Sequence, residues 1–213
     1  MKKTILCFGD SNTWGANPSG PRYGIDVRWP RRMAALLGDD YDVIEEGFNG
    51  RTCLIDDPVE GGHKSGAAYL PACLMSHNPL DLVIIMLGTN DTKQRFGLNA
   101  FTIAQGASEL IKLVKQYAQR ADGTVPKILL ASPILVGENL MDIFPMGAIF
   151  GKNAIDIAKG LSAEYAMVAA NHTTDFIDAA QHADPSPLDA IHMSADGQLA
   201  LAEAFAAKVR EIL

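Results

Sequence analysis

Near its start the chain reads TILCFGDSNTWG at residues 4–15, which joins a predicted strand to a polar turn. Residues 4–8 form a short apolar run that predicts a buried strand. Ser11 follows where this strand ends, between Gly9 and Gly15. Glycine lets the backbone bend sharply and leaves room for a ligand. A Gly-Asp-Ser tripeptide is also common in ordinary turns, so a chemical role for Ser11 depends on the rest of the chain.

A second segment, near the C-terminus, supplies an acid and a base. Asp189 and His192 are three residues apart, so one short turn can bring both toward the Ser11 region. A serine hydroxyl needs a base to take its proton, and histidine is the side chain that titrates near neutral pH. An aspartate on the other ring nitrogen orients the imidazole. Taken singly, Asp189 also fits a cap and His192 a polar loop, but together with Ser11 they predict the order nucleophile, acid, base.

Two further apolar runs end in polar loops that contain glycine. Residues 41–45 lead into GFNGRT at 47–52, and residues 82–87 lead into GTND at 88–91. The carboxyl ends of parallel strands meet at one edge of a sheet, so these loops are expected beside Ser11. The Asn90 amide and a glycine backbone N–H can donate to a developing oxyanion. Asn90 is equally typical of a plain turn, and that alternative stays open.

The four positions together resemble a known family. In order and in motif, the signature residues of the SGNH (GDSL-like) hydrolases are matched by Ser11, Gly50, Asn90 and His192. A narrower set of motifs is similar to the bacterial arylesterase/acyltransferase (perhydrolase) subgroup: CFGDS at 7–11, TWG at 13–15, DDP at 56–58 and LDLVIIMLGTNDTK at 80–93. The resemblance extends from Leu6 to the C-terminal helix.

Two residues depart from the patterns of these relatives. Asn12 stands where the family motif has leucine, which should alter packing beside the nucleophile and not the nucleophile itself. Gly50 stands where members of the subgroup can carry alanine, so the backbone donor remains and the pocket wall loses a methyl group.

The resemblance implies acyl transfer through a covalent intermediate on Ser11. His192 moves the proton, Asp189 orients His192, and the oxyanion is bound by the N–H groups of Ser11 and Gly50 with the Asn90 amide. Water, an alcohol or hydrogen peroxide then takes the acyl group. An apolar substrate channel is expected from Trp14, Phe150, Phe176 and Ile191, although simple core packing explains Trp14 equally well. Asp10 and Asp91 are expected to support the site or its turns.

Other functions remain open at this stage. A carbohydrate O-deacetylase or a thioesterase would use the same residues on a different ester. A non-catalytic, flavodoxin-like module for a small ligand is a third alternative, but the complete set of nucleophile, acid, base and donors argues against it.

Composition limits the class of protein further. The 213 residues fit one α/β unit, and the net charge of −7 argues against nucleic-acid or anionic-membrane partners. No apolar run approaches the roughly 20 residues of a membrane span, and the run after Lys2 and Lys3 is too short for a signal peptide. Three irregularly spaced cysteines favour reduced, buried thiols in a cytoplasm. No Cys/His cluster has metal-ligand spacing, so we expect neither a catalytic metal nor another cofactor.

Strands and helices alternate along the whole chain. Strands are predicted at residues 4–8, 41–45, 82–87, 127–131 and 174–178. Helices are predicted at about 28–38, 65–76, 99–119, 149–171 and 195–212, with Ser194 as the N-cap of the last. This alternation favours a parallel sheet covered on both faces. We therefore expect an α/β fold: a single three-layer α/β/α domain over residues 1–213, flavodoxin-like, with a central parallel sheet of about five strands.

Two loops interrupt this alternation. Residues 17–27 are rich in proline and glycine, and residues 137–147 contain the apolar side chains Met141, Ile143, Phe144 and Met146. Such side chains either form a satellite core beneath the loop or wall a pocket or subunit interface. The resemblance favours the interface, because the arylesterase/acyltransferase subgroup forms closed assemblies that include octamers. A homo-oligomer with a small ester as substrate is therefore the expected state.

Overall fold

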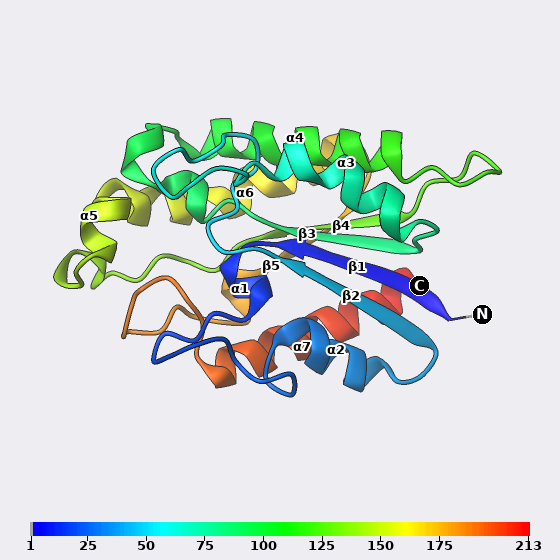
Figure 1. Cartoon of the computed structure of the whole chain (residues 1–213), viewed down its shortest axis with the longest axis horizontal. Helices are drawn as coiled ribbons and strands as arrows, with labels where there is room; N and C mark the ends of the chain where they lie inside the picture. Colours follow the sequence, from blue (N-terminus) through cyan, green and yellow to red (C-terminus); the bar gives the residue numbers. More distant parts are fainter. Residues whose placement is uncertain (1) are drawn as a thin grey trace.

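A parallel sheet forms the centre of the computed structural model, which describes residues 2–213 (Figure 1). Its strands are β1 (Lys3–Gly9), β2 (Tyr41–Gly47), β3 (Leu82–Met86), β4 (Lys127–Ser132) and β5 (Asp175–Asp178). They lie in the order β2-β1-β3-β4-β5, and every neighbouring pair is parallel. This is the flavodoxin-like order, which reverses direction between β1 and β3 and places a crevice at their carboxyl ends.

Helices cover both faces of the sheet (Figure 1). One face carries α2 (Trp29–Leu37) and α7 (Ala195–Ile212), and the other carries α3 (Gly66–His77), α4 (Ala100–Tyr117) and α6 (Asn153–His172). Two short helices, α1 (Ser11–Trp14) and α5 (Met146–Phe150), lie toward the end where the strands finish. The connections contain the 3-10 helices η1 (Asn90–Thr92), η2 (Gln94–Phe96), η3 (Leu140–Asp142) and η4 (Ala179–Gln181). The predicted α/β/α class is confirmed.

The two layers of core follow from the alternation of side chains along β1. Leu6 and Phe8 face the cluster beneath α3, α4 and α6, whereas Ile5 and Cys7 face the cluster beneath α2 and α7. Successive residues of a strand point to opposite faces, so a continuous apolar run fills both layers at once. In the described part of the chain, none of the helices has both the length and the apolar character needed to cross a membrane.

The helix predicted over residues 149–171 is two helices, and this prediction was wrong about the break. Gly151 separates α5 from α6 with a φ of 72°, in the left-handed region that favours glycine. A Cβ at this position would also crowd the Gln94 side chain of η2, with Gln94 Cβ 3.1 Å away. The break turns α5 away from α6 and toward the carboxyl end of the sheet. Ser194 caps α7 as predicted, by accepting the Gly197 N–H at 3.1 Å.

The loop at residues 137–147 does two things. Its Leu140 is fully buried in a small third core cluster with Phe150 and Ile191, so a satellite core is present. Its Met141 and Phe144 are 52% and 88% exposed, so the loop also carries apolar side chains at the surface.

Candidate active site

Ser11 is the first residue of α1 and follows β1 after a single residue. The Asp10 side chain caps this helix by accepting the Asn12 N–H at 2.9 Å. The backbone N–H of a first helical residue has no acceptor within the helix, so the Ser11 N–H is available to a ligand. Ser11 is 7% exposed, and its hydroxyl borders a cavity described below.

The His192 ring joins Ser11 to Asp189. Its Nε2 lies 2.8 Å from Ser11 Oγ, and its Nδ1 lies 2.6 Å from Asp189 Oδ2. The second carboxylate oxygen of Asp189 accepts the backbone N–H groups of Ile191 at 3.0 Å and of His192 at 2.8 Å. Burial raises the pKa of Asp189, but the His192 ring and these N–H groups lower it by more. The pKa therefore lies below its usual value. The carboxylate is therefore charged and fixed against the ring.

Asn12 holds the segment around His192 from below. Its Nδ2 donates to the Ile191 carbonyl at 3.2 Å, and its Oδ1 accepts the Met193 N–H at 3.1 Å. Asn12 is 2% exposed, and Gln198 Nε2 donates to its backbone carbonyl at 3.1 Å. The residue that departs from the family motif thus tethers both chain neighbours of His192. Sequence reasoning assigned it a packing effect only, because these partners lie far along the chain.

Gly50 and Asn90 border the same space as Ser11 and His192. Gly50 has a φ of 78°, in the left-handed region that favours glycine. Asn90 begins η1, and its Nδ2 donates to the Arg51 carbonyl at 3.2 Å. This hydrogen bond fixes the orientation of the amide and uses one of its two N–H groups. The second N–H remains for a ligand in the cavity.

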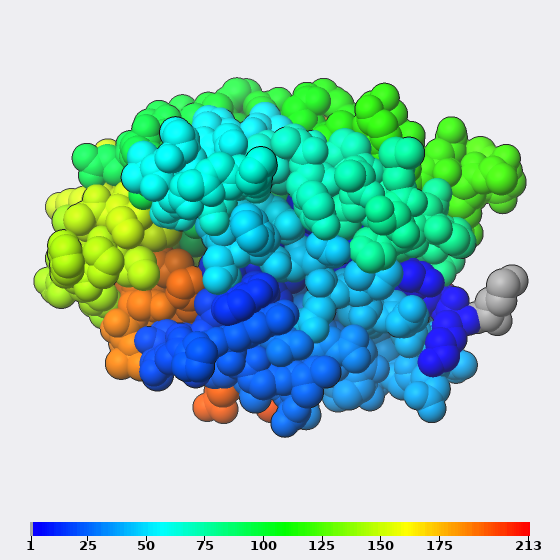
Figure 2. All heavy atoms as spheres, viewed as in Figure 1, coloured from blue at the N-terminus to red at the C-terminus, as the bar shows by residue number. Residues whose placement is uncertain are grey.

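A cavity of about 210 Å³ adjoins Ser11 and His192. Its apolar wall comes from Met146, Ile149, Phe150 and Ile191, and its polar wall from Asn49, Glu60, Asn90 and Lys93. Figure 2 shows the surrounding segments side by side at one end of the molecule: α5 in yellow-green, the loop before His192 in orange and residues 16–27 in blue. Sequence reasoning offered Met146 as part of a possible pocket wall, but it missed Ile149, because it placed this residue in a longer helix.

The four expected channel residues separate into two pairs. Phe150 and Ile191 line the cavity. Trp14 lies instead under the guanidinium of Arg22, 4.9 Å from the ring centroid, and anchors the loop at residues 17–27. Phe176 packs against the core cluster beneath α6, because it lies in the middle of β5 and not at its carboxyl end. Among the described residues, the cavity lining therefore includes neither Trp14 nor Phe176.

The model of the GDSL-like Lipase/Acylhydrolase family matches residues 7–200. The chain belongs to this family. The predicted family is thus confirmed, and with it the prediction of a hydrolase of carboxylic esters.

Solved structures similar to this GDSL-like hydrolase include two kinds of esterase. The inhibitor-bound aryl esterase of M. smegmatis is 39% identical, with a TM-score of 0.92, over 99% of this chain and 100% of that chain. Est24, a carbohydrate acetylesterase from Sinorhizobium meliloti, is 39% identical, with a TM-score of 0.91, over 100% of both chains. An acetylxylan esterase of Xylanibacter ruminicola is 31% identical over 150 residues, which cover 61% of this chain and only 28% of that protein.

Two buried acids are the chain neighbours of Ser11 and Asn90 in this hydrolase. Asp10 and Asp91 are 1% and 2% exposed. Burial raises the pKa of Asp10 to about 6, against the lowering effect of the Asn12 N–H and nearby positive charges. Burial raises the pKa of Asp91 to about 7, with the Cys53 N–H opposing the rise and the charge of Asp10 adding to it. Each therefore changes its charge near neutral pH, directly beside Ser11 or Asn90.

A cluster of four charged side chains, of which Lys93 and Asp57 are buried, forms part of the polar wall. Lys93, 2% exposed, lies 2.7 Å from Glu60 Oε1 and 3.5 Å from Asp57 Oδ2. Arg95 bridges the same two carboxylates at 3.2 and 3.3 Å. Burial raises the pKa of Asp57, but N–H donors and the two cations lower it below its usual value. The cluster holds the loop that carries Glu60 against η1 and η2. It places the charged groups of Glu60 and Lys93 at the cavity.

Proposed function

We propose that this chain is a serine esterase that hydrolyses small carboxylic esters through an acyl-Ser11 intermediate. The observation that carries the proposal is the continuous line from Asp189 through the His192 ring to Ser11 Oγ, which ends at a cavity. The contacts of 2.6 and 2.8 Å are within hydrogen-bond range, so the proton can move along the line without rearrangement.

The first half of the reaction acylates the serine. His192 Nε2 takes the proton of Ser11 as Oγ attacks the ester carbonyl, and Asp189 stabilises the resulting imidazolium. The negative charge that develops on the carbonyl oxygen is received by the N–H groups of Ser11 and Gly50 and by the free N–H of the Asn90 amide. His192 then returns the proton to the leaving alcohol, which departs and leaves the acyl-enzyme.

The second half transfers the acyl group to an acceptor. Water gives hydrolysis, and an alcohol or hydrogen peroxide gives acyl transfer by the same steps. The small cavity and its apolar wall of Met146, Ile149 and Phe150 favour short acyl groups and limit the number of competing waters. We propose transfer as a side activity of the same intermediate, measurable as alcohol ester formed per carboxylic acid released.

A carbohydrate O-deacetylase is the second candidate, and the polar wall supports it. Asn49, Glu60 and Lys93 face the cavity opposite the apolar side and offer donors and acceptors for sugar hydroxyls. The similarity to Est24 and to the acetylxylan esterase supports it as well. An acetyl group fits both candidates, so only the alcohol part of the ester distinguishes them. A thioesterase would use the same serine on an acyl-CoA.

The test is a substrate series with a chemical probe of the serine. If the chain is an esterase for small esters, kcat/KM should be higher for p-nitrophenyl acetate and butyrate than for longer esters, acetylated xylan and acetyl-CoA. A higher kcat/KM for acetylated xylan supports the deacetylase. A fluorophosphonate should label one serine per chain. Ser11→Ala should abolish labelling and turnover, with rate losses of several orders of magnitude, whereas Ser19→Ala in an exposed loop should keep both. Activity of Ser11→Ala within about tenfold of the parent contradicts the mechanism.

We further propose that the chain forms a homo-oligomer in the cytoplasm, with the octamer as the size that the resemblance implies. Phe144, 88% exposed, and Met141, 52% exposed, lie on the loop beside the cavity and support an interface there. The free, buried thiols of Cys7, Cys53 and Cys73 support a reducing compartment. Light scattering behind a sizing column tests the assembly, and a monomer near 22.8 kDa with full activity rejects it.

A further inference from the structure

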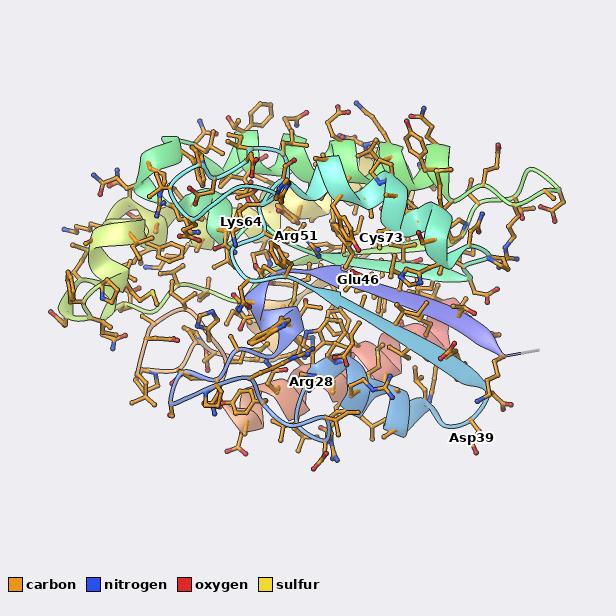
Figure 3. The ribbon with its side chains drawn as sticks, viewed as in Figure 1. Arg28, Asp39, Glu46, Arg51, Lys64 and Cys73 are labelled. Atoms are coloured by element: carbon orange, nitrogen blue, oxygen red, sulfur yellow. The ribbon has the colours of Figure 1, made fainter. Side chains whose placement is uncertain are left out.

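Three side chains that can bind a metal meet between β2 and α3, away from the catalytic serine. Glu46 lies next to the last residue of β2, and Cys73 and His77 lie one turn apart on α3. Their ligand atoms are all within 4.8 Å of one another, and Glu46 Oε1 is 3.0 Å from His77 Nε2. Figure 3 shows Glu46 and Cys73 on these two elements, with Arg51 beside them.

We propose that Glu46, Cys73 and His77 form a binding site for a zinc ion. A thiolate, an imidazole and a carboxylate are the ligand types that zinc prefers, and three protein ligands leave a fourth position for water. Bonds of roughly 2.0–2.3 Å hold tetrahedral ligand atoms roughly 3.3–3.8 Å apart. The cluster must therefore contract by about 1 Å at its widest separation. Glu46 and His77 are partly exposed and can supply this movement, while Cys73 is buried and fixed.

The surroundings of Glu46 leave its carboxylate available to the ion. The Tyr69 hydroxyl donates to Oε2 at 3.3 Å and orients the group, as a second layer of hydrogen bonds does in metal sites. The nearby guanidinium of Arg51 donates to the backbone carbonyls of Gly9 and Glu46 rather than to this carboxylate. A thiolate and a carboxylate together balance the two charges of the ion, so the cluster becomes neutral when it is occupied.

A cavity of about 340 Å³ gives the ion a route to the cluster. It is lined by Glu46, Arg51, His63 and Tyr69, among others, so it reaches the Glu46 member of the cluster. The ion would join β2, an edge strand of the sheet, to the helix that covers it. Because a preformed site is absent from the unfolded chain, binding should raise the thermal unfolding midpoint.

The sequence hid this site because its third ligand comes from another element. Cys73 and His77 are four residues apart, the spacing that places two side chains on one face of a helix. Such a pair is common and does not predict a metal, so no metal site was expected. Only the tertiary contact between β2 and α3 adds Glu46.

The decisive experiment is a cobalt titration of the full chain after treatment with a chelator. Co²⁺ bound to a thiolate gives a strong near-ultraviolet charge-transfer band, and we expect this band to saturate at one ion per chain and to vanish when Zn²⁺ is added. Cys73→Ala should lose the band, and His77→Gln or Glu46→Gln should weaken Co²⁺ binding by on the order of tenfold or more. Zn²⁺ should raise the unfolding midpoint of the wild type more than that of any of these three ligand variants.

Matched variants separate this site from the rest of the molecule. Cys7→Ala removes another buried thiol, His182→Gln removes an exposed imidazole, and Ser11→Ala removes the proposed nucleophile. All three should bind Co²⁺ like the wild type. A bound cobalt without the thiolate band overturns the proposal, as does a band that survives Cys73→Ala. A lack of binding below millimolar Co²⁺ also overturns it. So does equal binding by His77→Gln and His182→Gln, and this comparison holds even if the Cys73 variant does not fold.

Discussion

Two sets of carboxyl groups lie around Ser11, and both are shielded from solvent, yet their charges differ. Asp189 is 8% exposed and receives an imidazole and two backbone N–H groups, so its pKa lies below the usual value. Asp10 and Asp91 are 1% and 2% exposed and receive backbone N–H groups but no paired cation, so burial raises their pKa values to about 6 and 7. Burial thus opposes charge in both places, and the partners decide which carboxyl stays ionised.

The largest effect on activity is expected from a change at Asp189. Asp189→Asn keeps the shape of the group but removes the charge that orients and stabilises the protonated His192 ring. We expect kcat for p-nitrophenyl acetate to fall by on the order of 10³–10⁴, as loss of an orienting acid does in other triads. Asp184→Asn, an exposed acid on the same segment, should leave kcat unchanged. A fall of less than tenfold in Asp189→Asn would reduce this residue to a cap of its turn.

The next largest effect is expected at Asn90, the neighbour of Asp91. Asn90→Ala removes the amide that the Arg51 carbonyl orients toward the cavity. Because an oxyanion donor acts in the transition state, kcat should fall by on the order of 10²–10³ with little change in KM. Steady-state kinetics on a short ester measures both constants. Asn99→Ala, which removes the cap of α4, is the control for a lost asparagine amide. A change confined to KM would mean that Asn90 binds substrate or stabilises the turn.

The paired and unpaired acids also predict opposite effects of pH on stability. A carboxyl with a raised folded pKa binds more protons in the folded state, so its contribution is present below about pH 4 and is lost as pH rises through its folded pKa. For Asp10 and Asp91 that window runs from the unfolded value of 3.8 to about 6 and 7. Asp189, whose folded pKa is lowered, loses its contribution only as pH falls below the unfolded value of 3.8.

Asp10→Asn isolates one of these groups, because asparagine still accepts the Asn12 N–H and caps α1. The free energy of unfolding of the variant relative to wild type should improve by about 2–3 kcal/mol from pH 4 to pH 8. Urea unfolding at the two pH values measures the difference. Asp26→Asn, an exposed acid, should show no such trend. If the stability of Asp10→Asn depended on pH in the same way as that of wild type, the ionisation of Asp10 would not be the source of the trend.

The sequence predicts which residues meet around Ser11 better than it predicts the pocket wall, and the reason is physical. Ser11, Gly50 and Asn90 each follow an apolar run, and parallel strands bring their carboxyl ends to one edge whatever the packing above them. The pocket wall depends instead on how α5 turns at Gly151, which brings in Met146 and Ile149. Phe176 was expected there, but alternation along β5 directs it into the core.

Contacts between side chains of distant segments could not be predicted from the sequence either, because they depend on tertiary packing. Residue spacing along one element gives no information on partners that come from another layer, such as Glu46 for Cys73. The charge state of Asp10 and Asp91 depends on burial and on their mutual distance, and neither property is written in a local motif.

The smallest effect is expected at Asn12. A change there tests how much the hydrogen bonds that hold the segment around Asp189 and His192 contribute to activity. Its side chain tethers Ile191 and Met193 and so fixes the backbone that carries His192. Asn12→Leu introduces the residue of the family motif and removes both hydrogen bonds. Because the His192 ring keeps its bond to Asp189, we expect kcat to fall by only about tenfold, with KM unchanged. Asn139→Leu is the matched control, since Asn139 Nδ2 donates to the Pro187 carbonyl at 2.8 Å on the same segment, farther along the chain from His192. Equal losses in the two variants would mean that the effect is not specific to the Asn12 tether. A rise in KM without a change in kcat would instead assign Asn12 to substrate binding.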